Sequence, residues 1–217
     1  MPEIPEVPGV FSAAQCLQTA ESIAATQEAS GAIPWSADGH TDPWDHVENA
    51  MALTAAGLLG PARAAFEWSR RTQRPDGTWP IQLRDGVIED PNSDSNFCAY
   101  IATGVWHHVL VTDDRRFAEA MWPVVAKAID FVLELQFSTG EIAWARGPSG
   151  IAEEALLTGC ASIHHSIRCA LALADYIDAP QPEWEVAAGR LGHAIARHPE
   201  SFVAKDRWSM EWYYPVL

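Results

Sequence analysis

The segment 39–48, GHTDPWDHVE, holds acidic side chains at a spacing that suits acid–base chemistry. Asp45 and Glu48 are three residues apart and therefore share one face of the helix expected to begin here. Two neighbouring carboxylates in an apolar cavity repel each other, so one of them keeps its proton near neutral pH, as a general acid must. We expect Asp45 and Glu48 to be catalytic and Asp42 to contact substrate. The structural alternative is that these acids cap the helix and stabilise its dipole.

Two further acidic clusters precede or open expected helices. The segment 89–96, EDPNSDSN, contains Asp94 and Asn96, and Glu153 and Glu154 lie in the first turn of another expected helix. We count Asp94 and Glu153 among the catalytic candidates and Asn96 among the substrate-binding candidates. The structural alternatives are an exposed turn with an N-cap for the first cluster and a favourable helix-dipole contact for the second.

Ten tryptophans in 217 residues, in an acidic chain, suggest an aromatic cavity for an uncharged or cationic small molecule. The remaining substrate-binding candidates are Trp35, Trp44, His46, Trp79, Trp144 and Trp212. Indole rings also pack the turns of helical proteins as structural anchors, so only part of this set is expected to face a cavity.

No residue pattern predicts a metal ion or a cofactor. The pairs His107–His108 and His164–His165 are adjacent in sequence, whereas metal ligands on one helix need a spacing of three or four residues. Cys160 and His164 have that spacing, but a buried cysteine usually behaves as a small hydrophobic residue. The chain also lacks a glycine-rich phosphate loop and a GxSxG elbow. We therefore expect neither a metal nor a cofactor.

The net charge of −15 at pH 7 excludes several classes of partner. Nucleic-acid-binding proteins neutralise phosphates with Lys and Arg, and anionic membrane surfaces attract the same cations. No run approaches about 18 apolar residues, so no membrane span is expected. The acidic, proline-rich segment 1–10 lacks the pattern of a signal peptide, and the cysteines form no CxxC pair. We expect a cytoplasmic protein that acts on a small molecule.

Segments with helical composition and spacing must position these residues. They are 13–27, 42–59, 62–73, 93–111, 114–136, 150–177 and 183–198. Gly60-Pro61 is expected to separate two helices and Pro123 to kink or restart one. The second, fourth and sixth segments carry few charges beyond their first turn, as buried helices do, whereas the helices ending at Gln73 and Gln136 are more highly charged. This predicts an all-α fold of stacked hairpins in an inner and an outer layer.

Three of the expected turns share the pattern Gln-x3-Gly followed closely by tryptophan. The copies begin at Gln27, Gln73 and Gln136. Two motifs, Arg63-Ala64-x3-Trp68-x4-Gln73-x3-Gly77-x-Trp79 and Lys127-Ala128-x2-Phe131-Val132-x3-Gln136-x3-Gly140, resemble the QW repeat of squalene–hopene cyclases and related terpenoid cyclases. The resemblance implies the α/α toroid that these enzymes share with protein prenyltransferase β-subunits.

A second resemblance points to another chemistry. The segment 117–145 looks like outer-helix segments of glucoamylase-type (α/α)6 glycosidases, whose carboxylates and tryptophans lie on the loops that enter the inner helices. The Asp-x-Asp-Asp run with which class II terpenoid cyclases protonate an alkene is absent from the chain.

The expected architecture is an incomplete α/α toroid of about four hairpins, in which inner-helix N-termini bring acids and tryptophans to one rim. Residues 1–217 are expected to form a single toroid domain or the N-terminal part of one. Because an open arc exposes the apolar flanks of its terminal helices, we expect a second copy or another chain to cover them.

The main functional hypothesis is a terpenoid-cyclase-like or prenyltransferase-like enzyme, using carboxylates in a tryptophan-lined cavity on an uncharged isoprenoid-like or other small substrate. One alternative is a glycoside-acting (α/α)6 enzyme, with Asp45 or Glu48 as acid and Glu153, Glu154 or Asp94 as base. The other is a non-catalytic binding or scaffold protein that has kept the toroid.

Overall fold

Helices form most of the protein, and the computed structural model describes residues 4–205. The helices within that range are α1 (Ala13–Thr26), α2 (Pro43–Ala55), α3 (Leu59–Thr72), α4 (Ser95–Thr112), α5 (Arg115–Glu134), α6 (Leu157–Tyr176) and α7 (Pro182–Arg197). Short strands and a 3-10 turn complete the set: β1 (Gln82–Arg84), β2 (Val87–Asp90), β3 (Ser93–Asp94), β4 (Ala145–Gly147), β5 (Gly150–Ile151) and Pro199–Ser201. Across the described residues, we find no helix with the length and apolarity that crossing a membrane requires.

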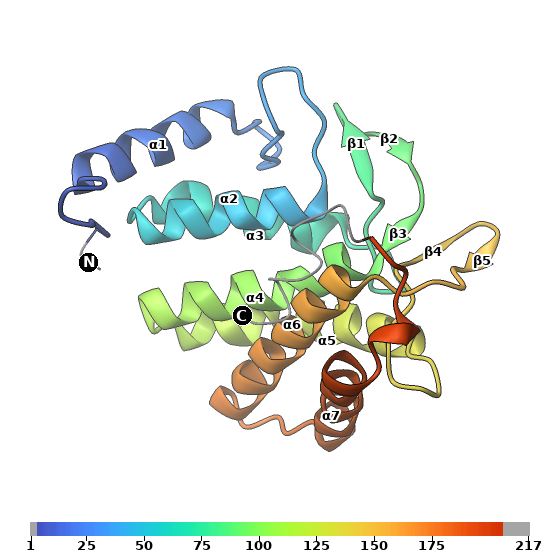
Figure 1. The fold of residues 1–217 in the computed structure, drawn as a ribbon. Coiled ribbons are helices and arrows are strands. Elements are labelled where there is room, and N and C mark those ends of the chain that lie inside the picture. The colour runs from blue at the N-terminus through green and yellow to red at the C-terminus, as the bar shows by residue number, and fades with distance from the viewer. Residues whose placement is uncertain (1–3, 206–217) are drawn as a thin grey trace.

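The helices alternate between two layers along the chain (Figure 1). In the inner layer, α4 packs against both α2 and α6, and each of the outer helices α1, α3, α5 and α7 packs against an inner one. Buried residues recur through most of α4, from Ser95 to Val109, as expected for a helix enclosed by neighbours. The predicted all-α fold of α/α-toroid type, built of stacked hairpins, is confirmed.

The core lies between the two layers. Leu53, Phe66, Ile101, Phe131 and Ile167 come from five different helices, and none is more than 2% exposed. Burial of such large apolar side chains is the main stabilising contribution to a fold of this kind. The core therefore holds the inner helices at fixed positions relative to the outer ones.

Backbone pairings join the starts of the three inner helices at one end of the arc (Figure 1). Thr41, which precedes α2, exchanges hydrogen bonds with Leu83 of β1. Asp94 of β3, which also precedes α4, pairs with Ala145 of β4. The β4–β5 hairpin then leads into α6. These short strands are the minor sheet content of the fold. They hold together the rim, which is the end of the arc where the inner helices α2, α4 and α6 begin.

Two predicted helix starts are wrong, each for a local reason. Helix α3 begins at Leu59 and includes Gly60-Pro61, because a proline in the first helical turn gives up an N–H that has no partner within the helix. Helix α5 runs through Pro123, so the restart considered there does not occur, while the predicted helix over 114–136 matches closely. Helix α6 begins at Leu157 and not near residue 150, because residues 145–151 contain the β4–β5 hairpin.

Candidate active site

The start of α2 holds a buried carboxylate within a network of hydrogen bonds. Asp42 caps the helix: its Oδ1 accepts a 2.9 Å hydrogen bond from the Asp45 backbone N–H, and Pro43 follows at the first helical position. Its Oδ2 accepts a short hydrogen bond from the indole Nε1 of Trp35, a residue that is 64% exposed. Asp42 is only 4% exposed. Asp42 therefore acts as the N-cap of α2, and it also holds the side chain of Trp35 beside the start of that helix.

Asp45 has the most perturbed carboxyl of this cluster. Partial burial raises its pKa from 3.8 to about 7, and the charge of Asp42, a side-chain hydrogen bond with Asp42 and the charge of Glu48 act in the same direction. The indole of Trp35 opposes the shift by donating to the carboxylate. Asp45 thus keeps its proton at higher pH than an ordinary aspartate does, as a general acid needs.

The start of α4 repeats this arrangement with a second carboxylate. Asp94 caps the helix by accepting a 3.1 Å hydrogen bond from the Phe97 backbone N–H. Burial raises its pKa from 3.8 to about 6; hydrogen bonds from the backbone of Phe97 and Asn96 oppose the shift, and the charge of Asp42 adds to it. The charge of Asp42 therefore raises the pKa of two carboxyls, that of Asp45 on α2 and that of Asp94 before α4. Asp45 and Asp94 therefore both hold a proton at higher pH than an ordinary aspartate does.

Aromatic rings join α2 to α4 beside the carboxylates. The Trp44 ring lies 5.9 Å from that of Phe97 and 5.6 Å from that of Tyr100, measured between centroids. The Tyr100 hydroxyl donates a 2.8 Å hydrogen bond to Glu48 Oε1. Glu48 is exposed, so this bond fixes a carboxylate that would otherwise be mobile. Together these contacts place an apolar wall and an ordered carboxylate next to Asp45.

A cavity of about 150 Å³ adjoins Asp94 between the first turns of α4 and α6. Its lining includes Asp94 and two more of the predicted residues, Asn96 and Trp144. The structure thus brings together side chains from the starts of two inner helices and from the preceding loops. They are Asp42, Trp44, Asp45 and Glu48 at the start of α2, Asp94 and Asn96 at the start of α4, and Trp35 and Trp144 from the loops.

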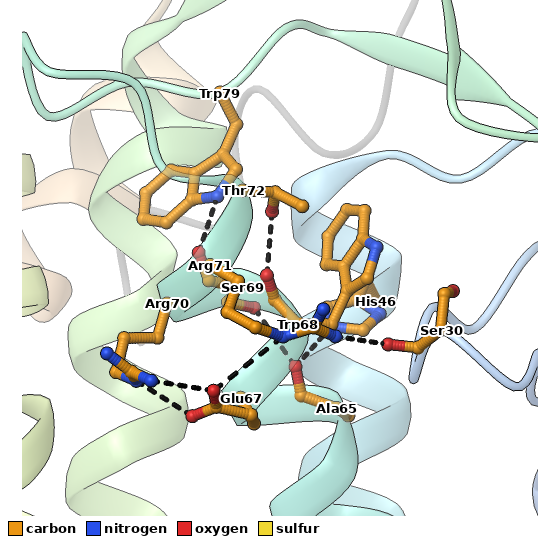
Figure 2. A network of polar contacts seen from close by, with 10 residues as sticks. All are labelled: Ser30, His46, Ala65, Glu67, Trp68, Ser69, Arg70, Arg71, Thr72 and Trp79. Atoms are coloured by element: carbon orange, nitrogen blue, oxygen red, sulfur yellow. Dashed lines mark hydrogen bonds and ion pairs between the residues drawn. The ribbon is translucent and has the colours of Figure 1, made fainter.

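Two predicted substrate contacts lie in the core instead of at the rim (Figure 2). His46 is 1% exposed; its Nδ1 accepts from the Ile33 N–H at 3.1 Å, so its Nε2 carries the proton and donates to the Ala65 carbonyl at 3.0 Å. Burial lowers its pKa to about 4, so the ring is neutral. Trp79 is 2% exposed and donates from Nε1 to the Ser69 carbonyl at 3.0 Å. Both side chains stabilise the packing between α2, α3 and the following loop.

Two other predicted residues do not join the cluster. Glu153 is exposed on the loop between β5 and α6, so its expected place in a first helical turn is wrong. Trp212 lies outside the described residues. The structure adds Tyr100 and Thr158, which the sequence analysis missed. The sequence signal for Thr158 was a single hydroxyl in an apolar stretch, while the contact of Tyr100 with Glu48 joins residues 52 positions apart.

Metal-binding side chains do not gather in the described part of the chain. Between residues 4 and 205, no three His, Cys, Asp or Glu side chains form a group that could hold a metal ion. The Cys160 sulfur lies within hydrogen-bond distance of both backbone polar atoms of Ile142, at 3.5 Å from the nitrogen and 3.4 Å from the oxygen. His165, the neighbour of the His164 considered from sequence, lies with its Nε2 3.4 Å from the sulfur of Cys169.

The sequence matches no family model. It is 78% identical over 214 residues to "MMP endo-(1,4)-3-O-methyl-alpha-D-mannosidase" of Mycolicibacterium hassiacum (strain DSM 44199 / CIP 105218 / JCM 12690 / 3849). That match covers 99% of this chain and 60% of the relative, so the chain spans about three fifths of the relative's length.

Solved structures with a similar fold are much more distant in sequence. A D-mannose isomerase matches with a TM-score of 0.64 at 12% identity, over 90% of this chain and 54% of that chain. The endo-β-1,4-glucanase CMCax of Acetobacter xylinum matches with a TM-score of 0.60 at 12% identity, over 84% and 58%. The family 76 glycoside hydrolase (mannosidase) Bt3792 of Bacteroides thetaiotaomicron VPI-5482 matches with a TM-score of 0.57 at 9% identity, over 77% and 48%. At these identities the likeness shows the fold alone.

These findings correct the main functional hypothesis. The prediction of a terpenoid-cyclase-like or prenyltransferase-like enzyme is wrong, because the 78% identical relative is named as an endo-mannosidase. The resemblance to the terpenoid cyclases was correct for the α/α-toroid fold only. The glycoside-acting alternative agrees with the name of that relative.

Proposed function

We propose that this chain is part of an endo-acting glycoside hydrolase that cleaves α-(1→4)-linked chains of 3-O-methyl-mannose. The observation that carries the proposal is the 78% identity over 214 residues to a protein of that name. The rim supports it from the chemical side, because glycosidic bonds are cleaved by carboxyl pairs of unequal pKa. The sugar chain would be the small, uncharged ligand that the acidic composition favours.

In the proposed reaction, Asp45 is the general acid. Its pKa of about 7 leaves a proton to donate to the departing glycosidic oxygen at neutral pH. Asp94, whose pKa is raised to about 6, is the general base or nucleophile that this part of the chain offers. Asp42 is a positioning residue, since it holds Trp35 and raises the pKa values of both carboxyls.

The aromatic side chains at the rim are proposed to bind the sugar rings. Trp35 is exposed, and Trp144 lines the cavity next to Asp94. An indole offers a broad apolar face for the C–H groups of a pyranose and an N–H for its oxygens. Three expectations stay predictions. They are the single-domain organisation, a second copy or another chain that covers the open edge of the arc, and the cytoplasmic location.

The proposal is tested by incubating the full chain with an α-(1→4)-linked oligosaccharide of 3-O-methyl-mannose and following the products by mass spectrometry. We expect internal cleavage to shorter oligosaccharides, and a loss of about 10²- to 10⁴-fold in rate for Asp45→Asn. Asp85→Asn is the matched control, because Asp85 is exposed at the tip of the β1–β2 hairpin with a φ of 50° that Asn tolerates. Absence of cleavage by the unmodified protein, or full activity of Asp45→Asn, would contradict the proposal.

A further inference from the structure

The cavity between α4 and α6 has the dimensions of a binding site for a ring-sized group. It encloses about 150 Å³ and lies between Asn96 on α4 and Thr158 on α6, with Asp94 at the same end. An apolar cavity of about 150 Å³ in a protein is large enough to take a six-membered ring. A pyranose ring or its substituents can therefore enter it from the side of the carboxylates.

Two residues that line the cavity each carry a buried polar atom without a partner in the described structure. Asn96 Oδ1 and Thr158 Oγ1 are both buried, and neither makes a hydrogen bond to any residue from 4 to 205. Such atoms are unfavourable unless a ligand or water satisfies them. The Asn96 oxygen accepts only, whereas the Thr158 hydroxyl donates or accepts. The pair therefore suits a ligand hydroxyl, which can donate to Asn96 and accept from Thr158.

Apolar side chains form the part of the wall away from Asp94 and Ser95. Ile142 and Ile163, which are 0% and 1% exposed, line the cavity together with Leu156. A free sugar hydroxyl directed at these side chains would lose its water without gaining a partner, which is unfavourable. A methyl ether buries its methyl group against the same side chains and has no hydrogen to donate.

We propose that this cavity is the subsite that selects a methylated pyranose, with a free hydroxyl on Asn96 and Thr158 and the methyl ether against Ile142 and Ile163. The proposal rests on the proposed glycoside-cleaving function and deepens it, because it assigns the discrimination between methylated and unmethylated sugars to named residues.

Gly159, in the first turn of α6, offers a way to fill the cavity without disturbing the fold. A Cβ at this position would lie 3.7 Å from Leu156 Cβ and 3.9 Å from Asn96 Cβ, which are ordinary contacts with two lining residues. Alanine is also the better helix former, so Gly159→Ala should not destabilise α6. Gly189 in α7 is the matched control: it is exposed, and an added Cβ there meets no atom within 4 Å.

The experiment measures binding of two α-(1→4)-linked oligosaccharides, one of 3-O-methyl-mannose and one of mannose, by titration calorimetry. Asp45→Asn serves as the background so that neither ligand is consumed. We expect the background variant to prefer the methylated ligand by about 10-fold or more. Adding Gly159→Ala should remove most of that preference by weakening binding of the methylated ligand, whereas adding Gly189→Ala should leave it unchanged. Thermal unfolding confirms that both alanine variants fold.

Equal affinity for the two ligands, no binding of either, or an unchanged preference in the Gly159→Ala variant would overturn the subsite. Cleavage of the oligosaccharides by the unmodified protein is measured separately. Cleavage combined with an unchanged preference would reject the subsite alone, while methyl-selective binding without cleavage would retain the subsite and reject the proposed hydrolase.

Discussion

The side-chain amide of Gln73 donates a 2.9 Å hydrogen bond to the backbone carbonyl of Val124, which lies 51 residues further along the chain in the next outer helix. The same nitrogen donates to the Gly77 carbonyl at 3.0 Å and so closes its own turn. Gln27 and Gln136 make the equivalent pair of bonds, in which the long-range acceptors are the carbonyls of Pro61 and Ala187. The Gln-x3-Gly motif is therefore a joint between successive outer helices.

This role explains why the motif correctly predicted the α/α-toroid fold but wrongly suggested terpenoid-cyclase chemistry. Gly77 has a φ of 86°, and a Cβ there would lie 2.2 Å from the backbone oxygen of Lys127 in the neighbouring outer helix. Only glycine allows that approach, so the requirement arises from stacking outer helices and not from any substrate. Toroids that carry out different reactions face the same geometric requirement.

Replacing Gln73 with alanine should destabilise the fold. The substitution leaves the carbonyls of Val124 and Gly77 without their amide donor, at a cost of about 1–3 kcal/mol in the free energy of unfolding. Urea unfolding measures this change. Gln18→Ala is the matched control, because Gln18 is exposed in α1 and its loss should change the free energy by less than about 0.5 kcal/mol. Equal stability of the two variants would show that the joint contributes nothing.

The sequence predicted the elements whose signals are local. The acids at the starts of α2 and α4 were found because N-cap chemistry depends on a few adjacent residues, and the structure places Asp42 and Asp94 as caps. Glu153 was misplaced because the pairing of Arg146 with Ile151, which removes this region from α6, has only a weak local signal. Tyr100 was missed because its bond to Glu48 depends on how α2 and α4 pack.

The tryptophans also show which positions local sequence can and cannot assign. Trp79 lies two residues after its motif glycine and is buried, while Trp35 and Trp144 lie four residues after theirs and reach the rim or the cavity. The residue count after the glycine thus distinguishes the packing ring from the two rings that face the site. That distinction is visible in the sequence, but its meaning depends on the path of the loop above the inner helices.

The raised pKa of Asp45 should reduce the stability of the protein at neutral and higher pH. The unfolded chain releases this proton near pH 3.8, whereas the folded protein keeps it until about pH 7, so stability attributable to this group falls as the pH rises between those values. Asp45→Asn removes the penalty. We expect the variant to be more stable than the unmodified protein at pH 8, and this advantage to disappear near pH 4, as measured by urea unfolding.

The control for that comparison is Asp85→Asn, which reports the effect of the same substitution at an exposed position. An Asp45→Asn variant that is less stable than the unmodified protein at pH 8 would mean that Asp45 is a structural carboxylate. A gain in stability together with a loss of cleavage is the combination expected of a functional group held in an unfavourable environment.

The pH dependence of cleavage should distinguish Asp45 from Glu48 as the acid. With Asp45 as acid, kcat/KM should fall above about pH 7, and with Asp94 as base it should fall below about pH 6. The charge of Glu48 helps to raise the pKa of Asp45, so Glu48→Gln should move the alkaline limb to lower pH. The amide oxygen that this substitution introduces can still accept from Tyr100. If Glu48 were the acid, the variant would instead lose the activity at every pH.

Thr158→Val should separate stability from sugar binding in a single substitution. Because the Thr158 hydroxyl is buried without a partner among the described residues, its replacement by a methyl group should leave the unfolding free energy unchanged or raise it. Thr103→Val is the matched control: the Thr103 hydroxyl lies 3.0 Å from that of Ser166 in the core, so the same change there should destabilise by about 1–3 kcal/mol. Binding of the methylated oligosaccharide should respond in the opposite way, weakening several-fold in Thr158→Val because the ligand hydroxyl loses a partner. If Thr158→Val instead destabilised the fold and left binding intact, the hydroxyl would belong to the packing of α6 and not to the cavity.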